Sequence, residues 1–210
     1  MSLRRVQFRR GLTLIELMLA LAITAMVAAA IGVMISAIES GESSRRDNRD
    51  LVVRTYAATT RLSAYLSRSM SVLEVGTVNA VVWLNDWREG GTVHATELRW
   101  LVFDSVNNSI DVYFVDFPDE WNEVQQALED DEYLSGTDWS AVLSSYTSAG
   151  YVSNITLVDG VNSMTITTDQ PAAVDSTSIT FDIGFHLEAT DETLNRALTI
   201  TILKHQPPIA

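Results

Sequence analysis

Glu16 is a carboxylate inside an otherwise uncharged apolar segment, and this placement is the strongest chemical signal in the sequence. Residues 12–38 read LTLIELMLALAITAMVAAAIGVMISAI, and Glu16 is the one charged residue among these 27. A carboxylate within such a segment costs about 2.5–3.5 kcal/mol on membrane-insertion scales. A carboxylate at such a position is expected to have a cationic partner and a function, so Glu16 is a candidate functional residue.

The apolar segment is long enough to cross a membrane as a helix. Its 22 residues from 17 to 38 carry no charge and extend roughly 33 Å as a helix, against a hydrocarbon core about 30 Å thick. The span is preceded by four arginines: Arg4, Arg5, Arg9 and Arg10. This bias favours a cytoplasmic amino terminus and places the acidic body of the chain outside.

The residues RRGLTLIEL (9–17) resemble the processing and methylation signature of type IV prepilins and of type II secretion pseudopilins. The resemblance implies that prepilin peptidase cuts between Gly11 and Leu12 and then methylates the new amino terminus. A residue without a Cβ suits that cut, because the backbone can lie extended in the peptidase cleft. Glu16 is then the fifth mature residue, and the resemblance implies that it pairs with the Leu12 ammonium of a neighbouring subunit. Such a desolvated pair would fix the axial register of each incoming subunit.

The resemblance also implies partners and a location. The partners are the prepilin peptidase and methyltransferase, other pilins or pseudopilins, an inner-membrane assembly platform and membrane lipid. The chain is then a single-pass protein of the bacterial inner membrane, with a periplasmic head, that joins a filament after assembly. No cofactor is implied. The sequence departs from the family in its first mature residue, which is usually phenylalanine and is Leu12 here.

Two other interpretations of the amino-terminal segment are open. A basic start followed by Ala28, Ala29 and Ala30 also fits a secretory signal peptide with an A-x-A cleavage site. An uncleaved membrane anchor fits the same segment. Against the signal peptide, the apolar run continues to Ile38, and Glu16 has no use inside a signal sequence.

The composition argues against nucleic-acid binding and against one type of pilin. The formal charge is −13, and loss of residues 1–11 with their four arginines takes it to −17. Such an acidic chain does not attract nucleic acid by general electrostatics. There is no cysteine, which rules out the carboxy-terminal disulfide loop of many major pilins and favours a minor pilin or a pseudopilin.

The patterns beyond the span predict an α+β, pilin-like fold. Apolar residues at spacings of three and four predict one long helix from 12 to about 75, with glycine-mediated bending near Gly32 or Gly41. Alternation predicts antiparallel strands at 78–84, 97–103, 110–115, 179–187 and 198–202, with hairpins at 107–108 and 189–193. A partly helical insertion is expected at 118–147, with a helix that begins at Pro118.

This pattern divides the chain into a leader (1–11), a transmembrane helix (12–38), an amphipathic extension (39–75) and a β-rich head (76–210). The size and the β-rich head look like the J-type minor pseudopilin of type II secretion, or a similarly sized minor pilin of type IV pili.

No catalytic or metal-binding pattern stands out. The three histidines are scattered, and they are interpreted as polar strand or tail residues. The acidic run 129–132 is either part of a calcium site or a solvated face, and the lack of a calcium-loop spacing favours the solvated face. The five tryptophans form either a contact surface or part of the core, and strand aromatics favour the core.

Two classes of function follow. The first is a structural subunit that is processed and assembled into a pseudopilus or pilus. The second is a membrane-anchored β domain that binds a ligand or an exported substrate. No residue supports an anchored enzyme.

Overall fold

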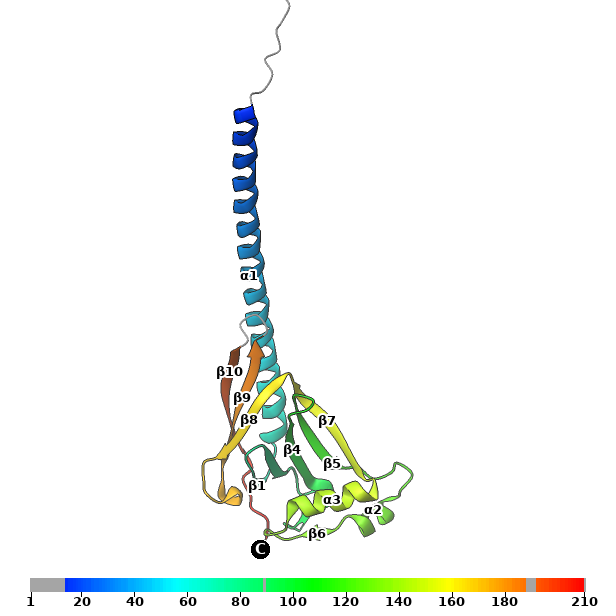
Figure 1. Ribbon diagram of the computed structural model, residues 1–210. Coiled ribbons are helices and arrows are strands. Elements are labelled where there is room, and N and C mark those ends of the chain that lie inside the picture. The colour runs from blue at the N-terminus through cyan, green and yellow to red at the C-terminus, as the bar shows by residue number, and fades with distance from the viewer. Residues whose placement is uncertain (1–13, 89, 188–191, 210) are drawn as a thin grey trace, which may run out of the picture. The chain divides into compact units, whose positions relative to one another are not determined.

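The computed structural model describes residues 14–88, 90–187 and 192–209, and it divides the chain into two compact units (Figure 1). The boundary falls after Arg46, within helix α1 (Leu14–Leu66). The amino-terminal unit ends there, and the head unit covers 47–210. The described elements confirm the α+β class, with a long amino-terminal helix followed by antiparallel sheets.

In the amino-terminal unit, α1 is apolar on every side. Among the described residues, Leu14–Glu42 is the one helical segment long and apolar enough to cross a membrane, judged by length and composition. Its apolar side chains are exposed, with Leu14 at 76%, Val33 at 72% and Met26 at 74%. Gly32 and Gly41 both lie within the continuous helix.

In the head unit, the same helix buries one of its faces. Leu51, Ala58, Leu62 and Leu66 are at most 6% exposed, and their spacing of seven, four and four places them on one helix face. They contribute to a core together with strand residues such as Phe181.

The largest sheet among the described residues has five antiparallel strands, in the order β1-β2-β4-β5-β7. A second sheet has the order β10-β9-β8, and a third pairs β3 with β6. The strands of the first sheet are β1 (Ser71–Val75), β2 (Asn79–Trp83), β4 (Leu98–Asp104), β5 (Ser109–Val115) and β7 (Val152–Asp159). The others are β3 (Val93–His94), β6 (Glu132–Tyr133), β8 (Val161–Thr168), β9 (Ser178–Leu187) and β10 (Glu192–Thr201).

Local sequence explains several of these elements. Asn108 has a φ of 53° in the turn between β4 and β5, a conformation that asparagine tolerates. In β9, Ile179, Phe181, Ile183 and Phe185 are at most 2% exposed, while Thr180, Asp182 and His186 between or beside them are more exposed and Gly184 is also buried. The hairpin predicted at 189–193 falls largely outside the described residues, but β9 and β10 do pair antiparallel.

The helices of the insertion are α2 (Glu123–Glu129) and α3 (Trp139–Ala149). Helix α3 contributes to a second core, in which its Trp139 and Tyr146 pack with strand residues such as Trp83 and Trp100. Short 3₁₀ turns lie at Ala95–Glu97 (η1) and Ala173–Asp175 (η2).

Two expectations about these elements were wrong, and two strands were missed. The helix does not continue to 75, because it ends at Leu66 and Ser71–Val75 pairs with β2 as strand β1. Met70 and Leu73 continue the helical spacing of three and four, but backbone pairing with β2 makes 71–75 a strand. The insertion helix begins at Glu123 instead of Pro118, because the Asn122 side chain accepts bonds from Val124 N and Gln125 N and caps it. Strands β7 and β8 were not predicted.

Leu62 offers a test of how the helix supports the head unit. Its side chain is fully buried in the first core, so Leu62→Ala should lower the free energy of unfolding by about 2–5 kcal/mol. Thr60→Ala, on an exposed position of the same helix, should change it by less than about 0.5 kcal/mol. Urea unfolding of the full chain in detergent micelles, followed by tryptophan fluorescence, measures both. Equal stability of the two variants would contradict this packing.

Candidate processing and assembly site

The structure describes one of the three predicted site residues. Gly11 and Leu12 lie outside the described residues. Glu16 lies in the first turn of α1 and is exposed. A carboxylate at this end of a helix is favoured by the helix dipole, because the amino-terminal end carries partial positive charge.

The surroundings of Glu16 are apolar. Ile15 is 75% exposed, Leu17 54% and Met18 64%. A surface of this kind is suited to lipid or to apolar helices, and a charge within it is stabilised by an opposite charge from the same environment. The geometry therefore offers an exposed carboxylate, within an apolar surface, at the beginning of the helix.

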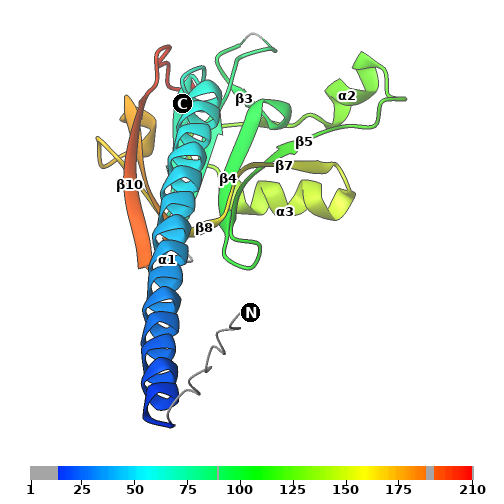
Figure 2. The same cartoon turned by 90° about the horizontal axis from the view of Figure 1, so that it is seen from above.

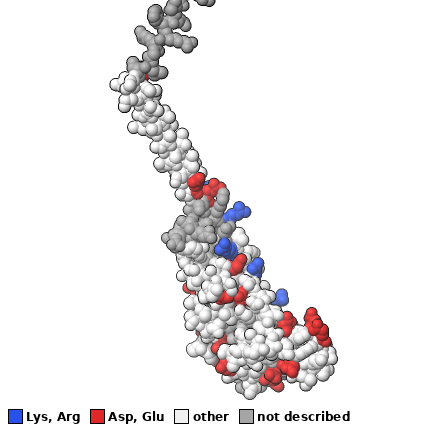
Figure 3. Space-filling view, turned by 45° about the vertical axis from the view of Figure 1, so that its right-hand side comes forward, with Lys and Arg blue, Asp and Glu red and all other residues white. Residues whose placement is uncertain are grey.

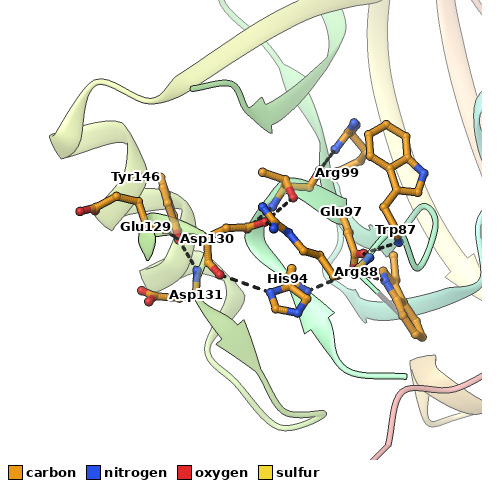
Figure 4. A network of polar contacts seen from close by, with 11 residues as sticks. Trp87, Arg88, His94, Glu97, Arg99, Glu129, Asp130, Asp131 and Tyr146 are labelled. Carbon is orange, nitrogen blue, oxygen red and sulfur yellow. Dashed lines mark hydrogen bonds and ion pairs between the residues drawn. The ribbon is translucent and has the colours of Figure 1, made fainter. Parts of the chain in front are cut away.

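A second polar arrangement lies in the head unit and centres on Glu97 (Figure 4). The Glu97 carboxylate is buried, and its Oε2 accepts hydrogen bonds from Trp83 Nε1 at 3.0 Å and from His94 N at 3.1 Å. Its Oε1 accepts from the backbone N–H groups of Trp87 and Arg88. These four donors satisfy the carboxylate and tie the loop after β2 to the start of β4.

The same arrangement holds α2 in place (Figure 4). Asp130 directly follows α2, is buried, and accepts from Arg88 Nε at 3.1 Å and from Thr96 Oγ1 at 2.7 Å. The Tyr146 hydroxyl donates to Glu129 O at 2.7 Å and accepts from Asp131 N at 3.1 Å. Burial raises the pKa of the Tyr146 phenol far above its usual value, so the hydroxyl stays a donor at neutral pH.

These contacts show how the side chains of the acidic run 129–132 are placed. Asp130 is turned inward and bonded to Arg88 and Thr96, while Glu129, Asp131 and Glu132 are exposed. Within the described part of the chain, no group of three His, Cys, Asp or Glu side chains is placed to hold a metal ion. The run therefore consists of three exposed carboxylates and one buried carboxylate.

The histidines and tryptophans take different roles. His94 Nδ1 lies 3.3 Å from Asp130 O, His186 lies in β9 and His205 follows β10. Trp83 and Trp100 are buried, as the strand pattern indicated, Trp139 is buried in α3, and Trp121 is partly buried. Trp87 is 66% exposed and lies on the surface. The position of Trp87 outside the predicted strands was the sequence feature that could have indicated its exposure.

The comparison with protein families falls on the amino-terminal segment. Residues 7–32 match the model of the prokaryotic N-terminal methylation motif, a segment that contains Gly11, Leu12 and Glu16. The match supports a type IV prepilin-like protein, a pilin or pseudopilin processed by prepilin peptidase and anchored by its apolar helix. No curated protein and no solved structure matches the chain.

Glu97 offers a test of the polar arrangement in the head unit. Glu97→Gln replaces one acceptor oxygen with an NH₂ group that faces N–H donors, which should lower the free energy of unfolding by about 1–3 kcal/mol. Glu132→Gln removes one exposed carboxylate and should change it by less than about 0.5 kcal/mol. Denaturant unfolding of the full chain gives both values. A Glu97→Gln variant as stable as the unchanged chain would count against this description.

Proposed function

We propose that the chain is a structural subunit, a minor pilin or pseudopilin, that is processed after Gly11 and assembled into a type II secretion pseudopilus or a type IV pilus. The proposal rests on one observation. The methylation motif at 7–32 overlaps the start of an exposed apolar helix whose first turn holds Glu16.

The route follows from the chemistry of this segment. The arginines before Gly11 stay in the cytoplasm while α1 inserts, and the apolar side chains of Leu14–Glu42 face lipid. Cleavage then creates an ammonium on Leu12, and Glu16 becomes the fifth residue of the mature chain. On leaving the membrane, the apolar helix surface is covered by the helices of neighbouring subunits. The Glu16 carboxylate pairs with a neighbour's Leu12 ammonium, and this sets the axial register.

The finer assignment is to a minor subunit. The chain lacks cysteine, and its size and β-rich head look like the J-type minor pseudopilin or a minor pilin of similar size. Its partners are then the prepilin peptidase and methyltransferase, other pilins or pseudopilins, and the inner-membrane assembly platform, with the head unit in the periplasm.

The first test is cleavage. Intact-mass measurement of the purified protein should give a chain that begins at Leu12, with a mass increase of one methyl group on it. Gly11→Val should stay uncut yet inserted, because the change adds a Cβ at the cut and leaves the span intact. Gly32→Val, where an added Cβ meets nothing within 4 Å, should be cut normally. An unchanged chain that begins at Met1 or after Ala30 would contradict processing and favour an anchored binding domain or a signal peptide.

The second test is the role of Glu16. Glu16→Gln keeps the shape and removes the charge, so the variant should insert at least as well, because the carboxylate opposes insertion. It should be processed, but its incorporation into assemblies should fall by about tenfold or more, since the neighbour's ammonium loses its counter-charge. Glu39→Gln, at an exposed position of the same helix, is the matched control and should assemble normally. Co-purification with partner subunits measures both, and normal assembly of Glu16→Gln would overturn the role.

A cross-linking experiment distinguishes a subunit in the filament shaft from a subunit at the filament tip. A subunit in the shaft has a neighbour whose first residue reaches Glu16, whereas a subunit at the tip has none above it. A cross-link from residue 16 to a partner's first residue therefore places the subunit in the shaft, and its absence from assembled complexes places it at the tip.

A further inference from the structure

Helix α2 presents an apolar face that covers nothing within the described part of the head unit. Val124 is 70% exposed and Leu128 is 77% exposed, and their spacing of four places them on one side of the helix. Leu134, just beyond, is 59% exposed. The contacts of Asp130 and Tyr146 fix the carboxyl end of α2 to the head unit, so the face is held in a defined position. We call Val124, Leu128 and the carboxylates around them the acidic helix face.

The segment that carries this face has acidic and no basic residues, and Arg88 from the loop after β2 pairs with Asp130 at its end. Residues 118–138 contain eight of the 27 acidic residues of the chain and no lysine or arginine. Figure 3 shows Asp and Glu side chains gathered toward the lower end of the head unit. The exposed carboxylates nearest α2 in sequence are Asp119, Glu120, Glu123, Glu129, Asp131 and Glu132. A partner for this surface must supply apolar contact together with positive charge.

The head unit also carries a groove with the complementary chemistry. It has a volume of about 530 Å³ and is bounded by the end of α1, the loop after β2 and the segment after β10. Its apolar walls include Trp87, at 66% exposed, and Leu203, at 76% exposed. Arg68 and Lys204 supply its two cationic groups, and Lys204 is the one lysine of the chain. We call this the tryptophan groove.

We propose that the tryptophan groove of one copy receives the acidic helix face of a second copy. Apolar side chains meet apolar walls, and the carboxylates around α2 meet Arg68 and Lys204. Two copies that met through the same face would place like charges together, which is unfavourable.

The contact joins two different surfaces, so it is heterologous and can propagate. Figure 2 shows α2 and the start of the carboxyl-terminal segment, next to β10, on different sides of the head unit. Each copy that docks its helix face therefore keeps its own groove open for the next, as heterologous contacts allow.

A weak contact is sufficient here, and this step rests on the proposed function. If α1 anchors both copies, the two head units are confined to one membrane surface or one filament, and a second contact becomes effectively intramolecular. Exposed ion pairs contribute little individually, so Trp87, Leu203 and Leu128 supply most of the stabilisation and the charges supply orientation.

The single lysine makes a direct test available. A carbodiimide joins an amine to a carboxylate with no spacer, and besides the amino terminus Lys204 is the one amine that the sequence supplies. The full chain, reconstituted in lipid vesicles from equal amounts of ¹⁵N-labelled and unlabelled protein, is treated and digested. The expected product joins Lys204 to a carboxylate within 119–132, with the two peptides drawn from differently labelled copies. A product drawn within single copies alone, or one to carboxylates elsewhere, overturns the proposal.

Matched variants separate docking from folding. Leu128→Asp should lower the yield of the mixed-label product by about tenfold, while Val106→Asp, at 85% exposed in the turn after β4, should leave it unchanged. Both should unfold at the same denaturant concentration as the unchanged chain. Equal yields from the two variants would overturn the proposal.

The experiments also show separately whether the docking contact or the processed-subunit role is wrong. Cleavage at Gly11 and dependence of assembly on Glu16 are measured without Lys204. If both hold and no mixed-label product forms, the docking contact alone is wrong. If the product forms on a chain that is not processed, the contact stands and the processed-subunit role falls.

Discussion

The structure depends on one constraint, the apolar surface that α1 exposes along Leu14–Glu42. No residue in the most apolar part of this segment is buried among the described residues. Its side chains therefore need an apolar environment supplied by other molecules. Farther along the same helix, Leu51 to Leu66 bury one face against the sheets. A single helix thus has two surroundings, and the carboxylate of Glu16 near its beginning is a group that lipid does not accommodate without cost.

Local sequence predicted the elements whose side chains show a single period. Strand β9 was predicted because Ile179 to Phe185 alternate strictly, and the turn before β5 was predicted because Asn107 and Asn108 suit it. The end of α1 was missed because Met70 and Leu73 continue the helical spacing, and only pairing with β2 makes 71–75 a strand. In β7, Asn154, Ile155 and Thr156 are all exposed, so the strand shows little alternation.

The processing motif and Glu16 could be found from sequence because they are contiguous, whereas the arrangement around Glu97 could not. Glu97, Trp83 and Asp130 are far apart in the chain and meet only after the sheets form. A buried carboxylate also has the same sequence signature as an exposed one. The position of Asp130 within an acidic run concealed that it alone turns inward to bind Arg88 and Thr96.

Strand β10 ends its sheet, because among the described strands it pairs with β9 alone. Its ten residues form a long edge of the kind onto which a foreign strand can add. Exposed Asn195 and Arg196 stand along it, and a charged side chain on an edge strand discourages such addition. Neutral replacement of Arg196 would therefore favour aggregation during overproduction, with little effect on the folded state.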